Sequence, residues 1–158
     1  MSDDVRRLDL ASATGDDLDA VGGLLRDLNL EVEDATPSAQ VLSNRVAELL
    51  GDGDTEILLA GEPPAGLAVL RVRKAIWTPH REASLAELYV VPDRRGHELE
   101  RDLVEAAMDA ARARGADFIE LSVGSSDVNA RRLYEDLGFD NHEVGSEDGL
   151  ALHYDRPL

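Results

Sequence analysis

Apolar residues recur at helical spacing in two segments of the first third of the chain. In the first segment, Thr14-Gly15-Asp16 can cap a helix that we expect to run to about Asn29. In the second, Pro37 suits a first helical turn and Gly51 ends the pattern. The apolar positions are Leu18, Val21, Leu24, Leu25 and Leu28, followed by Val41, Leu42, Val46, Leu49 and Leu50. Each stripe predicts a helix with one buried face.

Short runs of apolar residues predict strands at 5–8, 56–60, 66–73 and 84–91. Gly61-Glu62-Pro63-Pro64 is typical of a hairpin connection between the second and third of these strands. Residues 76–81 are expected to form a loop, and Pro92-Asp93 ends the fourth strand. The middle of the chain is therefore expected to form a sheet.

The last third alternates between helical and strand patterns. A helical stripe is formed by Leu99, Leu103, Ala106, Ala107 and Ala110. Gly115 stops this helix, and a buried strand is expected at 117–123. Ser126 or Asp127 can cap a short helix through Leu137, with Gly138 just past its end, and two last strands are expected near 139–144 and 150–154. This order predicts an α/β fold, a mixed sheet with helices on its faces.

The chain of 158 residues carries 33 acidic residues against 16 basic ones, a formal charge of -17, and a single lysine. Self-repulsion of this size favours a salt-rich cytoplasm, because the Debye length falls to about 3 Å in 1 M salt. An acidic protein without salt adaptation is the alternative. Nucleic acid is not an expected partner, since binding phosphates requires clustered positive charge.

Cysteine is absent from the sequence, which excludes disulfides, thiol nucleophiles and thiolate metal sites. The histidines do not pair at metal-binding spacing, so we expect no metal site; they are His80, His97, His142 and His153. The chain shows neither a leader pattern nor an apolar run of bilayer length, so we expect a cytoplasmic protein with no membrane partner. The sequence leaves a homodimer open.

Residues 88–139 combine a strand, a turn, a helix, a second strand and a closing motif. The turn is Arg94-Arg95-Gly96-His97-Glu98-Leu99-Glu100-Arg101, and the closing motif runs from Asn129 through Tyr134 to Leu137-Gly138-Phe139. This order resembles the coenzyme A site of the GNAT superfamily of N-acetyltransferases. The resemblance implies one domain over 1–158, with a central mixed, mostly antiparallel sheet of about seven strands flanked by about four helices. It also implies acetyl-CoA as co-substrate and an amine of a small molecule or protein as acceptor.

The same resemblance implies a set of cofactor-binding residues. The strand backbone accepts the pantetheine arm like an added strand, and free amides at the start of the following helix hold the pyrophosphate. Asn129 bonds the pantetheine arm, and Tyr134 lies beside the sulfur. The residues are Leu88, Tyr89, Val90, Val91, Arg94, Arg95, Gly96, His97, Glu98, Leu99, Glu100, Arg101, Asn129 and Tyr134.

Two residues are candidates for proton transfer. Strand alternation places Glu87 on one face with Leu85, Tyr89 and Val91, so we expect a partly buried carboxylate with a raised pKa that can act as general base through water. The phenol of Tyr134 can donate a proton to the departing thiolate. The structural alternatives are a solvent-facing charge for Glu87 and a core aromatic residue for Tyr134.

The turn departs from the family pattern at Glu98 and Glu100, where glycine, or glycine and then alanine, is usual. Carboxylates near a diphosphate cost several kcal/mol where they are desolvated, by Coulomb's law at an effective dielectric constant of about 20. Two functions follow as hypotheses. One is an N-acetyltransferase that transfers acetyl directly to a primary amine. The other is a protein of the same fold that has lost acetyl-CoA and serves as a binding or regulatory module, its glutamates stabilising the helix start instead.

Overall fold

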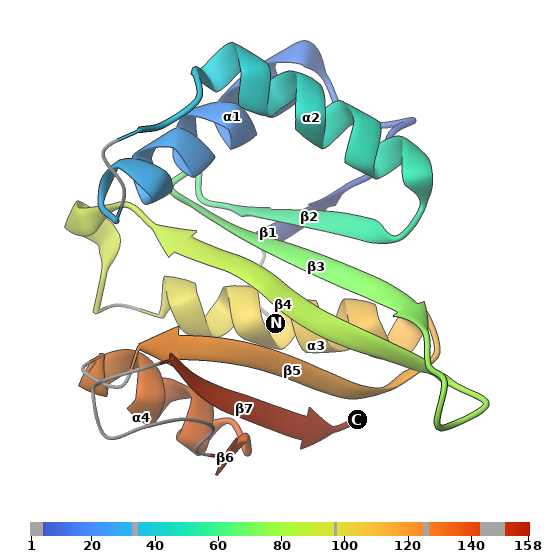
Figure 1. Ribbon diagram of the computed structural model, residues 1–158. Helices are drawn as coiled ribbons and strands as arrows, with labels where there is room; N and C mark the ends of the chain where they lie inside the picture. Colours follow the sequence, from blue (N-terminus) through green and yellow to red (C-terminus); the bar gives the residue numbers. More distant parts are fainter. Residues whose placement is uncertain (1–4, 33–34, 97, 125–126, 143–150) are drawn as a thin grey trace.

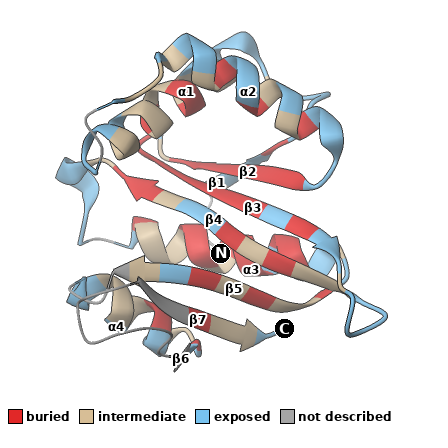
Figure 2. Ribbon diagram, in the orientation of Figure 1, coloured by how far each residue is buried: buried red, intermediate tan, exposed pale blue. Residues whose placement is uncertain are grey.

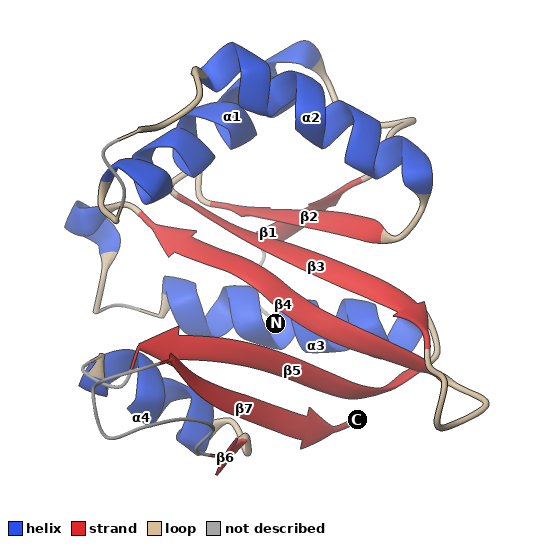
Figure 3. Ribbon diagram, viewed as in Figure 1, coloured by secondary structure: helices blue, strands red, loops and turns tan. Residues whose placement is uncertain are grey.

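A seven-stranded sheet lies between two layers of helices in the computed structural model, which describes residues 5–32, 35–96, 98–124, 127–142 and 151–158 (Figures 1 and 3). The strands are β1 (Val5–Leu8), β2 (Thr55–Ala60), β3 (Gly66–Lys74), β4 (Arg81–Val90), β5 (Ala116–Gly124), β6 (Asp140–His142) and β7 (Ala151–Pro157). The helices are α1 (Gly15–Leu30), α2 (Ala39–Asp52), α3 (Leu99–Ala113) and α4 (Val128–Asp136), with a 3₁₀ turn, η1, at Pro92–Arg94.

The strand order in the sheet is β1-β2-β3-β4-β5-β7-β6. Neighbouring strands pair antiparallel except β4 and β5, which are parallel and are connected through α3. This connection is the crossover that a parallel pair requires. The prediction of a mixed, mostly antiparallel sheet of about seven strands with about four helices is confirmed.

The ends of the first two helices follow local capping chemistry. Thr14 and Asp17 form a reciprocal capping box at the start of α1, as each side chain accepts a backbone hydrogen bond from the other residue. Helix α2 begins after Ser38, whose hydroxyl accepts from the Val41 amide, so Pro37 precedes the cap and does not lie in the first turn. The helix also continues past Gly51 to a left-handed Gly53, because only Gly53 supplies the positive φ of 83° that ends it.

Each face of the sheet has its own core (Figure 2). Helices α1 and α2 pack on one face around a core of Leu8, Val21, Leu24, Val46, Leu50, Ile57, Leu59, Leu67, Val69 and Tyr89. Helix α3 packs on the other face, where its stripe meets Leu70, Val72 and Leu85 and continues to Tyr134, Phe139 and Tyr154. Since each described helix has an apolar stripe and a polar face, none is long and apolar enough to cross a membrane.

A bulge in β4 changes which residues share a face. Val69 pairs with Glu87, whereas Leu70 pairs with Leu85, so Ala86 is an extra residue in β4. Leu85 therefore faces α3, while Glu87 lies at a pocket on the α1–α2 side. The expectation that Leu85 shares a face with Glu87 and Tyr89 is wrong, because the extra residue breaks the two-residue period of the strand.

Strands β4 and β5 separate beyond the bulge. Their parallel pairing runs from Arg81 to Ser84 on β4 and from Ala116 to Glu120 on β5, and it does not continue among the described residues. Figure 1 shows the two strands diverging toward their C-terminal ends, with the first turn of α3 behind the opening. The backbone of the second half of β4 is therefore left without a sheet neighbour on its β5 side.

Candidate active site

The backbone of β4 presents alternate residues to the side left by β5. The Val91 amide donates to the Ala65 carbonyl at 2.8 Å, which identifies this position of the antiparallel ladder as a hydrogen-bonded pair. By the alternation of that ladder, Tyr89 also turns its backbone toward β3, and Leu88 and Val90 turn theirs away. Of the four predicted strand residues, Leu88 and Val90 thus have the backbone orientation that an added strand needs. Part of this capacity is in use, because the Val90 carbonyl accepts from Arg95 Nε at 2.8 Å.

The turn after β4 leads into a helix start without a side-chain cap. Gly96 has a φ of 77°, and a Cβ built on it would meet no atom within 4 Å. Glu98 is the N-cap of α3 and caps no amide with its side chain. The Asp102 amide donates to the Glu98 carbonyl, so the amides of Leu99, Glu100 and Arg101 have no intrahelical acceptor. This is the arrangement of N–H groups that suits an anion.

The two glutamates of the turn have different surroundings. Glu98 is exposed. Glu100 is half-buried, its Oε1 accepts from the Gly96 amide at 3.4 Å, and its buried Oε2 has no hydrogen-bond partner in the described part of the chain. One carboxylate is therefore turned toward solvent, and the other lies against a turn amide.

The three arginines of the turn also differ. Arg95 forms an ion pair with Glu31 just past the end of α1, in which its Nη2 donates to both carboxylate oxygens at 2.7 and 2.9 Å, and its guanidinium lies 5.4 Å from the Tyr89 ring centroid. This pairing raises the pKa of Arg95 and lowers that of Glu31. Arg94 is exposed, Arg101 is half-buried, and neither has an ion-pair partner among the described residues. The charge of Arg95 is thus directed to α1, and Arg94 and Arg101 remain available to an anion. His97 lies outside the described residues.

Helix α4 carries the two residues of the closing motif. Asp127 caps the helix by accepting from the Ala130 amide at 3.1 Å. Asn129, in the first turn, is exposed. Tyr134 is buried, with ring centroids 5.9 Å from both Phe139 and Tyr154. Burial is the main cause that raises the pKa of Tyr134, and the charges of Asp127 and Glu100 raise it further. The phenol therefore stays protonated at neutral pH. It lies near the start of α3, since Glu100 is one of the charges that act on it.

Glu87 lies at a pocket of about 350 Å³ between the sheet and helices α1 and α2. Glu87 is exposed at the surface, contrary to the expected partial burial. Neighbouring atoms still remove enough water to raise the pKa of its carboxyl. The pocket is lined by Leu25, Leu28, Asn29, Pro37, Leu42, Val46, Leu49, Ile57, Val69, Arg71, Ala86 and Glu87.

The two candidate proton-transfer groups lie on opposite faces of the sheet. Glu87 lies on the side of α1 and α2, whereas Tyr134 belongs to the core on the α3 side. Where neighbouring strands are hydrogen-bonded, their backbone separates the two faces of the sheet. The pairing of β4 with β5 ends at Ser84. The region beyond Ser84 is therefore where groups from both faces can reach one reacting centre.

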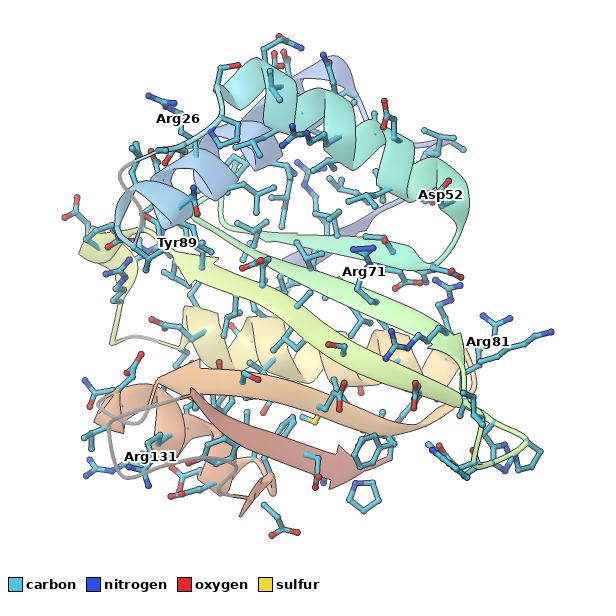
Figure 4. The ribbon with its side chains drawn as sticks, viewed as in Figure 1. Arg26, Asp52, Arg71, Arg81, Tyr89 and Arg131 are labelled. Atoms are coloured by element: carbon cyan, nitrogen blue, oxygen red, sulfur yellow. The ribbon has the colours of Figure 1, made fainter. Side chains whose placement is uncertain are left out.

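Sequence reasoning missed most of the pocket lining. Arg71 rises from β3 beneath α2 (Figure 4), and it lines the pocket together with side chains of both early helices. The helical stripes predicted that these aliphatic residues would be buried, but not that a pocket would remain between them and the sheet.

Comparisons with known proteins identify the family and the fold. The model of the acetyltransferase (GNAT) family matches residues 26–139. The crystal structure of a protein of Arthrobacter sp. FB24 that is classed as an acetyltransferase is 40% identical, covers 94% of this chain and 92% of that one, and superposes with a TM-score of 0.77. The yncA protein of Salmonella typhimurium, solved with its cofactor acetyl-CoA, has the same fold at 21% identity, with a TM-score of 0.75 and coverage of 98% and 92%.

One of the curated relatives is named for a specific acetyltransferase activity. Mycothiol acetyltransferase of Beutenbergia cavernae is 37% identical over 79 residues, which are 48% of this chain and 27% of that protein. The chain thus matches about a quarter of the length of that relative. The family match spans the strand, the turn and the closing motif described above. On this evidence the chain belongs to the GNAT family of acetyltransferases.

Proposed function

We propose that this protein is an N-acetyltransferase that transfers acetyl from acetyl-CoA directly to a primary amine. The observation that carries the proposal is the end of β4–β5 pairing at Ser84 beside an uncapped start of α3. Backbone groups of Leu88 and Val90 are oriented for the pantetheine arm, and the amides of Leu99, Glu100 and Arg101 are oriented for the pyrophosphate. Asn129 is exposed and available to the arm.

The residues present fit acetyl-CoA on one condition. Gly96 leaves open space at the turn, and Arg94 and Arg101 add positive charge. The Glu100 carboxylate must leave the Gly96 amide, at which it lies now. Since the contact is a long one at 3.4 Å and Oε2 has no partner among the described residues, a diphosphate that accepts from several turn amides and from Arg94 and Arg101 can displace it.

The proposed reaction uses one group from each face of the sheet. When bound, acetyl-CoA supplies the acetyl group as a thioester, whose carbon–sulfur bond breaks as the amide bond forms. Glu87 accepts, through water, the proton that the acceptor amine loses. Tyr134 donates a hydrogen bond to the thiolate that leaves, because its raised pKa keeps the hydroxyl protonated, and the thiolate then takes its proton from water. No covalent enzyme intermediate is required.

Binding of the donor tests this proposal. Acetyl-CoA at 100 times its Kd should stabilise the fold by about 2.7 kcal/mol and raise the melting temperature measured in molar salt. Tyr134→Phe should keep this shift and lose most of the acetyl transfer to a panel of amines, while Tyr154→Phe serves as a matched aromatic control. Absence of a shift at millimolar acetyl-CoA would contradict the proposal.

The contact of Glu100 with Gly96 favours a second candidate function, a binding or regulatory module that has lost acetyl-CoA. In that case the carboxylate occupies the anion position permanently and stabilises the helix start through the dipole. The same thermal-shift experiment separates the two functions, since a module of this kind shows no response to acetyl-CoA.

A further inference from the structure

The pocket beside Glu87 has an apolar floor and a charged mouth. Val46, Ile57 and Val69 line it and are at most 6% exposed. Half-buried aliphatic residues of α1 and α2 form its walls, namely Leu25, Leu28, Leu42 and Leu49. Arg71 and Glu87 line the same pocket and are exposed, so their charged ends lie at the opening.

Two of the three polar side chains of the lining, Arg71 and Glu87, have no hydrogen-bond or ion-pair partner within the described part of the chain. Asn29 is engaged, because its amide donates to Thr36 Oγ1 at 3.2 Å and to the Ala35 carbonyl at 3.5 Å. Arg71 has no ion-pair partner among the described residues, in a chain that carries 33 acids. The neighbouring Arg73, by contrast, is held by Glu82 at 3.0 Å.

Arg71 and Glu87 lie close together on the sheet. Glu87 pairs with Val69, and Arg71 is two residues further along β3 on the same face. Both side chains line the same pocket of about 350 Å³. One small molecule can therefore reach the guanidinium and the carboxylate at the same time.

We propose, on the basis of the function above, that the acceptor is a free α-amino acid with an apolar side chain. Its carboxylate binds Arg71 at the mouth, its amine faces Glu87, and its side chain enters the apolar floor. An α-amino acid carries an anion and an amine on one carbon, which matches two opposite charges at the mouth of an apolar pocket. A volume of about 350 Å³ lies at the small end of ligand sites, as a single amino acid requires.

Direct binding without the donor tests the pocket independently of the enzyme activity. Calorimetry with L-leucine should show binding that Arg71→Gln weakens roughly 10- to 100-fold, the usual value of a charge-assisted hydrogen bond. Arg73→Gln is the matched control on the same strand and should leave Kd unchanged. No leucine binding, or equal Kd values in both variants, would overturn the proposal.

A substrate series tests the same assignment during turnover. The released coenzyme A thiol can be titrated without protein background, because the chain has no cysteine. We expect kcat/KM for L-leucine to exceed the values for L-alanine and L-aspartate at least tenfold. In the wild type, KM for L-leucinamide should also exceed KM for L-leucine, because the amide lacks the carboxylate that binds Arg71. In Arg71→Gln the two KM values should become equal with little change in kcat for the amide.

The outcomes separate this proposal from the function on which it rests. Leucine binding that depends on Arg71, without acetyl transfer, would retain the pocket assignment and overturn the enzyme. Acetyl-CoA binding together with faster acetylation of a leucyl dipeptide or of 3-methylbutylamine than of leucine would retain the enzyme and overturn the amino-acid acceptor.

Discussion

The Glu100 carboxylate accepts a hydrogen bond from the Gly96 amide, with 3.4 Å between Oε1 and the nitrogen. Both residues belong to the turn to which we assign the pyrophosphate in the proposed function. Because Oε2 is buried with no hydrogen-bond partner among the residues that the structure describes, the carboxylate is held at the turn without being fully satisfied there. Glu98, two residues earlier, is exposed. The two glutamates should therefore affect donor binding differently.

Glu100→Gln should tighten acetyl-CoA binding, and Glu98→Gln should leave it nearly unchanged. By Coulomb's law, a negative charge about 6 Å from a phosphate weakens binding by roughly 1 kcal/mol at the dielectric constant of water and by roughly 3 kcal/mol at an effective value of about 20. Removing that charge should therefore lower Kd by about five- to hundredfold. Calorimetry at one fixed salt concentration measures both variants. Equal Kd values for Glu100→Gln and the wild type would show that the carboxylate turns away when the donor binds.

Loss of the Glu31–Arg95 pair should cost little stability. Both side chains are about 40% exposed, so Glu31→Gln should change the free energy of unfolding by at most about 1 kcal/mol. Arg95→Gln should cost more, because Arg95 also donates to the Val90 carbonyl and contacts the Tyr89 ring. A double-mutant cycle by urea unfolding gives the coupling, and equal costs of the two single variants would contradict this account.

Acetyl transfer should decline at acidic pH through the ionisation of Glu87. Desolvation raises the pKa of this carboxyl above 4.5, so kcat/KM should rise with pH through that raised value as the base loses its proton. Glu87→Gln should lower kcat roughly 100- to 10,000-fold and remove this limb of the profile. Glu82→Gln, on the same strand and outside the pocket lining, is the control. A limb that persists in Glu87→Gln would assign it to another group.

Asp17 should make the fold sensitive to strong acid. Its hydrogen bond from Arg6 at 2.5 Å is the main cause that lowers its pKa from 3.8 to about 2, and the Thr14 amide adds to the effect. The stability from this carboxylate is complete above pH 3.8 and is lost as the pH falls through about 2. This contribution to the free energy of unfolding is about 1–2 kcal/mol, after a reduction for solvent screening of the Arg6 side chain, which is 48% exposed. Urea unfolding of Asp17→Asn should lack this pH dependence, and an unchanged dependence would contradict it.

Salt should stabilise the protein. With a formal charge of -17, raising KCl from 0.1 to 1 M shortens the Debye length from about 10 to about 3 Å and weakens the repulsion between surface acids. We expect the melting temperature to increase by on the order of 5 °C. NaCl should act equally, since screening does not depend on the cation. A melting temperature that stays flat across this range would refute salt adaptation.

Local chemistry made much of the fold predictable from sequence. Thr14 and Asp127 are caps because their side chains accept hydrogen bonds from amides three residues further along the chain. Gly115 and Gly138 follow helices because each supplies a positive φ. The order of stripes and alternating runs was sufficient for the mixed sheet, and the closing motif from Asn129 to Phe139 identified the family.

Tertiary structure alone decided the features on which the chemistry depends. The bulge at Ala86 placed Leu85 and Glu87 on opposite faces, and it is set by the pairing of β4 with β3 rather than by any pattern within β4. The pairing of Arg95 with Glu31 required groups 64 residues apart to meet. The pocket requires α1, α2 and the sheet together. Sequence periodicity records which side chains are buried, whereas their partners are selected by packing between distant segments.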